Sequence, residues 1–226
     1  GDETDRALVK SNGELTYFMT DIIYHQKKID NKFDILLNIW GSDHSGYVKR
    51  LQSALAQLNK KEDYSFEIKL TSLVNLLNGK QVLKMSKREG NYVTLREVVE
   101  KVGSDVLRYM MISRSVDKKI DFDFEIVKSK SKDNPVFYIQ YAYARCMSLI
   151  SIYEKTFNTS LNNIDFMKVN LSNLNQNEEI IMIIKVCNFF NVITKAAKFY
   201  EPHRIANDLL DVAKDFHAYW GLGKLD

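Results

Sequence analysis

Hydrophobic and polar positions follow two different patterns along the chain, one before and one after about residue 94. Residues 33–41 form a continuous apolar run that ends at a glycine, which is typical of a buried parallel strand. Residues 46–59 repeat apolar positions at helical spacing, and residues 64–74 alternate apolar and polar positions like a strand. A strand, a helix and a second strand of these lengths favour part of a doubly wound α/β sheet.

Two shorter signals complete this first half of the chain. Residues 15–19 predict a short strand, and Asn78 with Gly79 predicts a tight turn before residues 80–86. The predicted strands are too few for a complete doubly wound sheet. We therefore expect only part of such a sheet, within residues 1–110.

The second half of the chain has a helical pattern. Thr94 and Gly103 predict the N-cap and C-cap of one helix, and another helical stretch follows directly. Residues 122–134 continue the helical pattern up to Pro135, because the residue before a proline resists the helical conformation. An Asn-rich loop is expected at residues 158–177, and longer helices are predicted at residues 135–157, 178–200 and 202–220. The predicted fold class is therefore α/β plus all-α, with a helical bundle over residues 111–226.

Composition and charge narrow the class of protein. Hydrophobic residues make up 45% and charged residues 27%, as in globular proteins. We find no apolar run near the roughly 18 residues that a membrane span needs, and the charged N-terminus does not resemble a signal peptide. The net charge of +3 permits an RNA partner without requiring one. The two cysteines and four histidines lack zinc-ligand spacing, so we expect no metal site. We expect both cysteines to be reduced, and a single disulfide between them is the alternative.

A basic segment stands out between the two halves: KMSKR at residues 84–88, followed by Gly90. One interpretation is an ordinary solvated turn. The other is a phosphate-binding loop, in which Lys84 and Lys87 aim their ammonium groups at one polyanion and Ser86 donates a hydroxyl. Phosphoryl and nucleotidyl transfer depends mainly on positioning and charge neutralisation, which such a loop can supply.

This segment resembles the KMSKS signature loop of the class I aminoacyl-tRNA synthetases, and its surroundings resemble the arginyl-tRNA synthetase family. Three other stretches agree, in the family's order. TYFMTDIIYH at residues 16–25 is similar to its substrate segment, and NIWGSDHSGYVKR at residues 38–50 to its nucleotide-side strand end. DNPVFYIQYAYAR at residues 133–145 is similar to the opening of its helical anticodon-binding domain. The resemblance implies the second half of a Rossmann-like catalytic domain over residues 1–110, then the anticodon-binding bundle, truncated at its C-terminus.

Besides its early C-terminal end, the chain departs from the family pattern in a sequence motif. The family's HIGH-type motif has two histidines that contact ATP phosphates, whereas the histidines here lie far apart, at positions 25, 44, 203 and 217. The resemblance therefore implies an internal or C-terminal fragment, and we expect these 226 residues to be inactive by themselves.

The substrate-like segment suggests how arginine would be selected. Tyr17 and Asp21 are four residues apart at an expected strand-to-helix transition and can converge on one pocket. A carboxylate pairs with a guanidinium in two-pronged fashion, and an aromatic ring can stack on its plane. The residues alone favour a helix-capping Asp and a core Tyr, whereas the resemblance favours the arginine pocket. His25, one turn further, is interpreted as a surface or packing histidine.

The end of the first predicted strand carries the nucleotide-side candidates. Gly41 permits close backbone approach, Asp43 could accept from ribose hydroxyls or the substrate amine, and His44 could face the adenine or the phosphates. Alternatively, Ser42 or Asp43 simply caps the following helix. The resemblance also implies that Lys87 and Lys84 are catalytic and that Met85 and Ser86 contact ATP.

The helical half offers candidates for RNA contact. Aromatic and Arg side chains can stack on unpaired bases, and an Arg or His at a helix start can meet a phosphate. An aromatic stripe at this spacing is more often part of a core. Asp121 and Asp123 look like paired carboxylates, for which a helix N-terminal role suffices. The tRNA-binding candidates are Tyr138, Gln140, Tyr141, Arg145 and Arg204, the last next to His203.

The resemblance implies an arginine–tRNA ligase that uses ATP with Mg²⁺ as substrates, binds arginine and tRNA(Arg), and holds no tightly bound metal. We expect a cytoplasmic monomer without membrane contact. Two alternatives stay open: a non-catalytic tRNA-binding module with a vestigial loop, and another class I synthetase, such as one for cysteine. The lack of a zinc-ligand set stands against cysteine.

Overall fold

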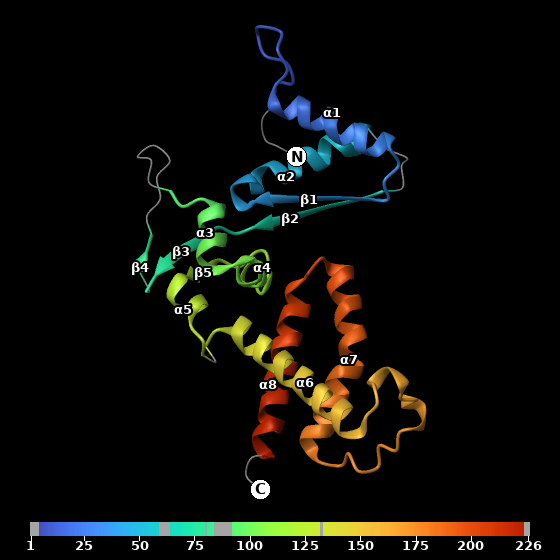
Figure 1. Cartoon of the computed structure of the whole chain (residues 1–226). Coiled ribbons are helices and arrows are strands. Elements are labelled where there is room, and N and C mark those ends of the chain that lie inside the picture. Colours follow the sequence, from blue (N-terminus) through green and yellow to red (C-terminus); the bar gives the residue numbers. More distant parts are fainter. Residues whose placement is uncertain (1–4, 59–63, 80, 84–91, 132, 224–226) are drawn as a thin grey trace. The chain divides into compact units, whose positions relative to one another are not determined.

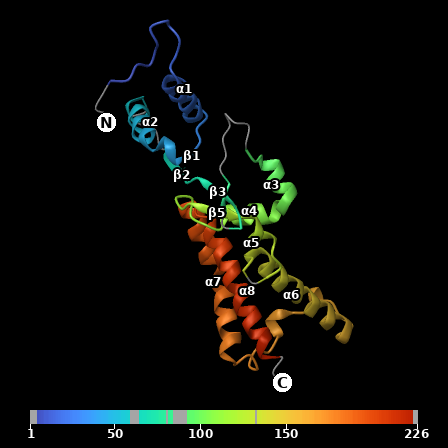
Figure 2. The same ribbon diagram turned by 90° about the vertical axis from the view of Figure 1, so that its left-hand side faces the viewer.

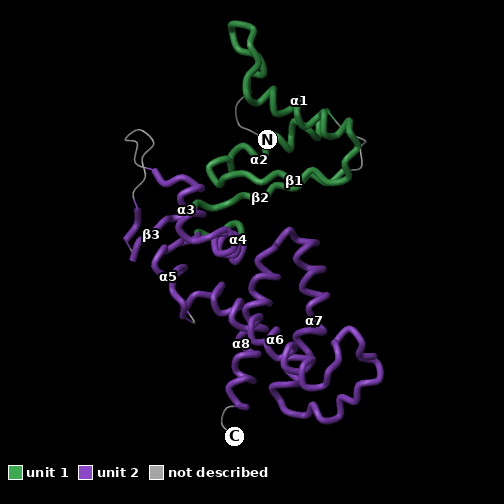
Figure 3. Tube along the Cα trace, viewed as in Figure 1, with its two compact units in different colours: residues 1–73, 116–119 green, residues 74–115, 120–226 purple. Residues whose placement is uncertain are grey.

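The computed structural model describes residues 5–58, 64–79, 81–83, 92–131 and 133–223. The chain divides into two compact units, coloured separately in Figure 3. Unit 1 contains residues 1–73 and 116–119, and unit 2 contains residues 74–115 and 120–226. The predicted division between residues 110 and 111 concerns domains of the family rather than packing units, and it stays a prediction.

Unit 1 places two helices on one face of a parallel pair of strands (Figure 1). The strands are β1 (Ile35–Gly41) and β2 (Ser65–Thr71), and the helices are α1 (Tyr17–Asp30) and α2 (Ser45–Leu58). A single 3₁₀ turn, η1 (Ser42–His44), links β1 to α2. The predicted parallel strands and the helix between them are confirmed.

Burial along β1 alternates between the two faces of the sheet. Leu36 is buried against Leu51 of α2, whereas Ile35, Leu37 and Ile39 point to the other face and are exposed. The prediction that this strand is buried throughout is therefore wrong, because the helices of unit 1 cover one face only. The remaining buried apolar side chains of this core are Ile22, Ile29 and Leu55.

The predicted strand at residues 15–19 is also wrong. Leu15 forms an isolated antiparallel bridge with Val9, and α1 begins two residues later. Thr16 has an extended backbone, and its hydroxyl accepts a hydrogen bond from the Met19 N–H at 3.3 Å. This N-cap satisfies an otherwise unpaired donor of the first helical turn. It therefore favours a helix where the apolar pattern predicted a strand.

Unit 2 contains a second, three-stranded sheet in the order β4-β3-β5. β3 (Val74–Asn78) and β4 (Gln81–Val82) form an antiparallel hairpin at the predicted turn, where Gly79 has a φ of +56°. β3 also pairs in parallel with β5 (Ile120–Asp123). The helical prediction for residues 122–134 is therefore wrong at its start, because Ile120 and Phe122 alternate into the core as a strand requires. It is also wrong at its end, because the helix stops at Lys128.

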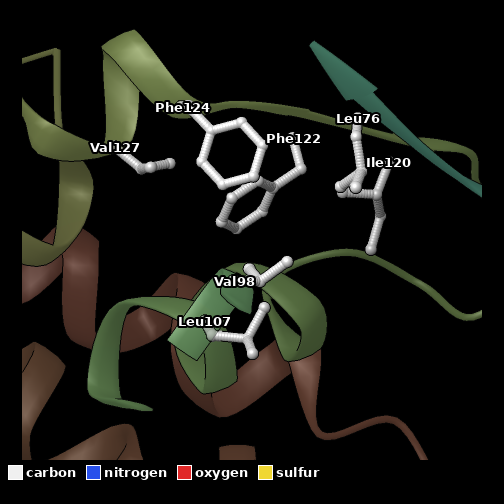
Figure 4. Close-up of a cluster of buried hydrophobic side chains, with 7 residues drawn as sticks. All are labelled: Leu76, Val98, Leu107, Ile120, Phe122, Phe124 and Val127. Carbon is white, nitrogen blue, oxygen red and sulfur yellow. The ribbon is translucent and has the colours of Figure 1, made fainter. Parts of the chain in front are cut away.

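Three short helices complete the part of unit 2 next to this sheet: α3 (Leu95–Val102), α4 (Ser104–Ile112) and α5 (Phe124–Lys128). Thr94 caps α3 as predicted, in a reciprocal capping box with Glu97, and Gly103 ends that helix at a φ of +84°. Figure 4 shows how the sheet and these helices share one core, which consists of Leu76, Val98, Leu107, Ile120, Phe122, Phe124 and Val127.

The three long helices of unit 2 are those predicted: α6 (Pro135–Phe157), α7 (Asn177–Phe199) and α8 (His203–Leu222). α8 packs against both α6 and α7, and Figure 2 shows α7 and α8 side by side. Two 3₁₀ turns, η2 (Leu161–Asn163) and η3 (Phe166–Lys168), interrupt the predicted Asn-rich loop.

Helix α7 is unusually apolar for a helix that is largely exposed. Within the described ranges it is the one helix long and apolar enough, by length and composition alone, to cross a membrane. The expectation that no stretch reaches this length is therefore wrong. Lys185 in its middle pairs with Asp215 of α8 at 2.5 Å, which anchors this helix to its neighbour.

Candidate functional site

The parallel strands of unit 1 end together, and the nucleotide-side candidates lie directly after them. Gly41 pairs with Thr71 in the last register position, and the Thr71 hydroxyl donates to the Trp40 carbonyl at 3.1 Å. The turn η1 and helix α2 begin at once. Ligands of open α/β sheets bind at this carboxyl edge of the strands. The candidates lie at that edge of the sheet, and nucleotide binding there stays a prediction.

Gly41 and Asp43 fit each other closely. A Cβ atom at Gly41 would lie 2.4 Å from Oδ1 of Asp43, so only glycine leaves the carboxylate its present position. The backbone at Gly41 has a φ of −65°, which any residue adopts. His44 lies beside the same carboxylate, with Nε2 at 3.6 Å from Oδ2, and both side chains are exposed. This strand end therefore presents one carboxylate and one imidazole to solvent.

The arginine-side candidates lie on α1, one helical turn apart. Tyr17 is the first residue of the helix and is 91% exposed. Asp21 is half-buried, and its Oδ2 accepts a hydrogen bond from the Tyr47 hydroxyl of α2 at 2.8 Å. Burial and this hydrogen bond raise the pKa of Tyr47 well above its usual range, so the phenol stays a proton donor. The predicted pocket between Tyr17 and Asp21 stays a prediction.

Tyr47 contacts the candidate residue Asp21, and the sequence analysis did not single it out. Its ring packs edge-on against Phe18 of α1 and tilted against Trp40 of β1, with centroids 5.6 Å away in both cases. Trp40 in turn lies 6.3 Å from the His44 ring. Tyr47 and Asp21 are 26 residues apart, so no local spacing connects them. The only sequence signal was that Tyr47 falls within the segment that resembles the family.

His25 is a packing histidine, one of the two interpretations offered above. Its Nδ1 lies 2.8 Å from the Asp21 carbonyl, and its Nε2 lies 2.7 Å from Nδ2 of buried Asn38. Asn38 Oδ1 accepts from the Lys28 ammonium at 3.3 Å, which fixes its Nδ2 as the donor to His25. The imidazole therefore carries its proton on Nδ1 and donates it to the Asp21 carbonyl. This chain of bonds anchors the backbone of Asp21 to β1.

The basic segment at residues 84–88 lies outside the described residues, and so do the calls on Lys84, Met85, Ser86 and Lys87. The described chain enters the segment from β4 and leaves it at Tyr92, shortly before the cap of α3.

The predicted tRNA-binding residues of α6 contact α8. Arg145 donates to the Tyr141 hydroxyl at 2.6 Å and to Nδ1 of His217 at 3.3 Å, and its guanidinium lies 4.2 Å from the centre of the Tyr141 ring. His217 donates from Nε2 to the Tyr138 carbonyl at 3.1 Å. These bonds favour the packing alternative for Tyr138 and Arg145. Gln140, in contrast, is exposed on the same helix.

The other polar candidates have local partners. Arg204 pairs with Glu201 at 2.5 Å and keeps 42% of its side chain exposed. Asp123 accepts from the backbone N–H groups of Glu125 at 2.9 Å and Gly79 at 3.1 Å, so its expected helix-terminal role is confirmed. Asp121 accepts from Asn75 at 2.8 Å.

Two observations concern metals and thiols. Within the part of the chain that the structure describes, no group of three or more His, Cys, Asp or Glu side chains could hold a metal ion. Cys146 and Cys187 are free thiols, and burial raises the pKa of the Cys146 thiol.

Comparison with known families adds to this geometry. Residues 13–123 match the sequence model for class I tRNA synthetases (I, L, M and V), and residues 139–223 match the DALR anticodon binding domain. The chain therefore belongs to the class I aminoacyl-tRNA synthetases. Within that class, its sequence relatives are arginine–tRNA ligases.

Two of these relatives illustrate the match. The arginine–tRNA ligase of Wolbachia sp. subsp. Brugia malayi (strain TRS) is 43% identical over 226 residues, which are 100% of this chain and 38% of that protein. That of Ehrlichia ruminantium (strain Gardel) is 45% identical over 223 residues, 99% of this chain and 37% of that protein. The chain thus spans well under half the length of the curated relatives it matches.

Solved structures agree with the fold. A crystal structure from Campylobacter jejuni, provisionally described as an arginyl-tRNA synthetase, superposes with a TM-score of 0.83 at 32% identity and covers 98% of this chain and 47% of that one. The arginyl-tRNA synthetase of Thermus thermophilus superposes with a TM-score of 0.63 at 18% identity, over 94% of this chain and 42% of that one. The second likeness concerns the fold alone.

Proposed function

We propose that the full-length protein is an arginine–tRNA ligase, which activates arginine with ATP and transfers it to tRNA(Arg). The observation that carries the proposal is the similarity of the whole chain, at 42–45% identity, to arginine–tRNA ligases. The arrangement on α1 and at the end of β1 supports it, because Asp21 and Asp43 offer carboxylates that could pair with a guanidinium and a ribose.

In the first step, the arginine carboxylate attacks the α-phosphate of ATP, which gives arginyl-adenylate and releases pyrophosphate. Asp21 binds the guanidinium through its carboxylate, and Tyr17 provides a ring for its plane. Gly41, Asp43 and His44 border the nucleotide, with Asp43 accepting from the ribose hydroxyls or the substrate amine. In this proposal, α1 carries the amino-acid side of the site and η1 carries the nucleotide side.

The developing charge on the phosphates needs cations. Lys87 and Lys84 supply two ammonium groups, and Met85 and Ser86 contact the nucleotide within the same segment. Mg²⁺ arrives with ATP as its substrate complex and neutralises further phosphate charge. Positioning and charge neutralisation supply most of the acceleration that such a transfer requires.

In the second step, the arginyl group passes from the adenylate to the terminal ribose of the tRNA, and AMP leaves. The helical part of unit 2 binds the tRNA, since it matches a domain described as anticodon binding. Gln140 and Tyr141 are the exposed members of the predicted α6 contact set, and Arg204 lies exposed at the start of α8. We place the protein in the cytoplasm, where it acts as a monomer.

The test is an amino-acid screen of the full-length protein, in which exchange of pyrophosphate into ATP is measured with each of the twenty amino acids, with and without tRNA. We expect exchange with arginine alone. Lys87→Ala should lower the exchange rate by about a hundredfold or more while tRNA binding stays intact, because a transition-state charge contact is lost.

Lys118→Ala is the matched control. Lys118 is exposed, and its 3.9 Å ion pair with exposed Asp117 contributes little to stability, so its loss should leave the exchange rate unchanged. Exchange with another amino acid would identify a different class I synthetase. Binding of tRNA without exchange for any amino acid would identify a non-catalytic tRNA-binding module.

A further inference from the structure

Asp21 is held by two contacts, one to its backbone and one to its carboxylate, that the proposed chemistry does not require. Its backbone carbonyl accepts from buried His25 at 2.8 Å, and its side-chain Oδ2 accepts from Tyr47 at 2.8 Å. The first contact holds the backbone of Asp21 in place, and the second orients the plane of its carboxylate. A side chain at an ordinary solvated helix position needs neither.

Tyr47 is itself constrained. Its ring packs against Phe18 and Trp40, so the phenol has little freedom to leave Asp21. Its raised pKa keeps the hydroxyl protonated, so it always donates. α1 and α2 therefore meet at one directed hydrogen bond beside the end of β1.

A carboxylate accepts about four hydrogen bonds, two at each oxygen. Tyr47 occupies one of these positions, and among the described residues no hydrogen-bond donor occupies a position on Oδ1. Three acceptor positions therefore stay available, in a plane that Tyr47 sets. A guanidinium offers paired donors in one plane and depends on this orientation, whereas an ammonium is a compact charge that does not.

We propose that Tyr47 is a positioning residue for substrate recognition: its hydroxyl orients the Asp21 carboxylate so that the site prefers a planar guanidinium to an ammonium. This inference rests on the proposed function, because it takes Asp21 as the arginine-binding residue. Tyr47 touches Asp21 rather than the reacting atoms, so it acts on binding and not on the chemical step.

The test compares Tyr47→Phe and Asp21→Asn in the full-length protein, by arginine-dependent pyrophosphate exchange. Tyr47→Phe keeps the ring contacts and removes only the hydroxyl. We expect the KM for arginine to rise about tenfold, the loss typical of one hydrogen bond to a charged group, with kcat and the KM for ATP within about twofold. Inhibition by agmatine, which has the guanidinium but no carboxylate, should weaken by the same factor. Inhibition by cadaverine, an ammonium compound, should not change.

Tyr24→Phe is the matched control. Tyr24 lies on the same helix as Asp21, is 58% exposed, and its hydroxyl has no hydrogen-bond partner among the described residues. It should leave both KM values unchanged. The double variant Tyr47→Phe with Asp21→Asn should be no worse than Asp21→Asn alone, since both changes act on one contact.

The outcomes separate the two ideas. If Asp21→Asn raises the KM for arginine and Tyr47→Phe does not, the positioning role is wrong and the arginine site stands. A fall in kcat together with rises in both KM values and a lowered Tm would show that Tyr47 is merely structural. If Asp21→Asn leaves the KM for arginine unchanged, or the wild-type protein does not use arginine, the proposed site fails and the role of Tyr47 fails with it.

Discussion

At position 41, the requirement for glycine comes from the neighbouring Asp43 side chain and not from the backbone conformation. A Cβ atom at Gly41 would lie 2.4 Å from Oδ1 of Asp43, yet the backbone at Gly41 is ordinary extended chain. The glycine is therefore needed for the space that it leaves. Because the nearest atom is the end of a flexible side chain, an added methyl group would move the carboxylate and not the strand.

We expect Gly41→Ala to lower kcat/KM for ATP by between about fivefold and a hundredfold, because a displaced carboxylate no longer borders the nucleotide. The Tm should change by less than about 2 °C, since the backbone conformation suits alanine. Pyrophosphate exchange at varied ATP concentration and thermal unfolding of the full-length protein measure the two effects.

Two controls decide whether the effect runs through Asp43. Gly46→Ala adds the same methyl group in the first turn of α2, where nothing lies within 4 Å, and should leave exchange unchanged. In an Asp43→Ala background, Gly41→Ala should have no further effect. An equal loss in both backgrounds would contradict the displacement of Asp43.

The residues of this site were predictable to different degrees. Asp43 and Tyr17 could be found because each belongs to a short segment whose order along the chain is informative. Tyr47 could not, since its partner Asp21 is 26 residues away and only the packing of α1 on α2 brings them together. The packing of Arg145 against His217 is similarly non-local, over 72 residues, so an exposed aromatic stripe and a helix contact looked alike in the sequence.

At the scale of elements, caps and turns decided more than apolar patterns did. Thr16 starts α1 where the apolar run suggested a strand, and Thr94 starts α3 as predicted. β5 was missed because its four residues run directly into α5, with Asp123 as the cap between them. Four residues are too few for a period of two to be distinguished from a helical turn.

Asn134 links two elements through four hydrogen bonds of one buried side chain. It is 4% exposed, and its amide nitrogen donates to the carbonyls of Val127 at 2.8 Å and Ser129 at 2.9 Å. Its amide oxygen accepts from the N–H groups of Val136 at 3.1 Å and Phe137 at 3.4 Å, which caps α6. One side chain thus joins the end of α5 to the start of α6.

We expect Asn134→Ala to lower the free energy of unfolding of unit 2 by about 2–4 kcal/mol, because a cap is lost and buried carbonyls lose their donor. Asn134→Ser keeps a capping hydroxyl but not the donors, so its loss should be smaller by about 1 kcal/mol. For both variants, the loss is measured by denaturant unfolding of the full-length protein, with hydrogen exchange in peptides of α5 and α6 as the probe. Equal losses for the two variants would mean that the cap contributes nothing.

At the scale of the molecule, the chain builds two separate cores. One consists of side chains from α1, β1 and α2. The other consists of side chains from β3, β5 and helices α3 to α5, and is drawn in Figure 4. Each core lies wholly within its own unit. The sequence predicted two parts from the change of period, but the second sheet belongs by packing to the helical unit, which periodicity cannot reveal.

Two core substitutions test whether each unit depends on its own core. Leu51 and Phe122 are both fully buried, one in each cluster. Leu51→Ala should destabilise unit 1 by about 2–5 kcal/mol, and Phe122→Ala should destabilise unit 2 by about 3–5 kcal/mol, through lost burial and the cavity left behind. Hydrogen exchange in the full-length protein should speed up only in the unit that carries the change, because separately packed regions open separately.

The matched controls make the same chemical changes without burial. Leu58→Ala removes a side chain that is 58% exposed from the same helix as Leu51, and Phe190→Ala removes a phenyl group that is 75% exposed on α7. Both should alter stability by less than about 0.5 kcal/mol. If Leu51→Ala accelerated exchange around Phe122 as much as around Leu36, the two cores would have to unfold as one, and the division into units would describe geometry without describing stability.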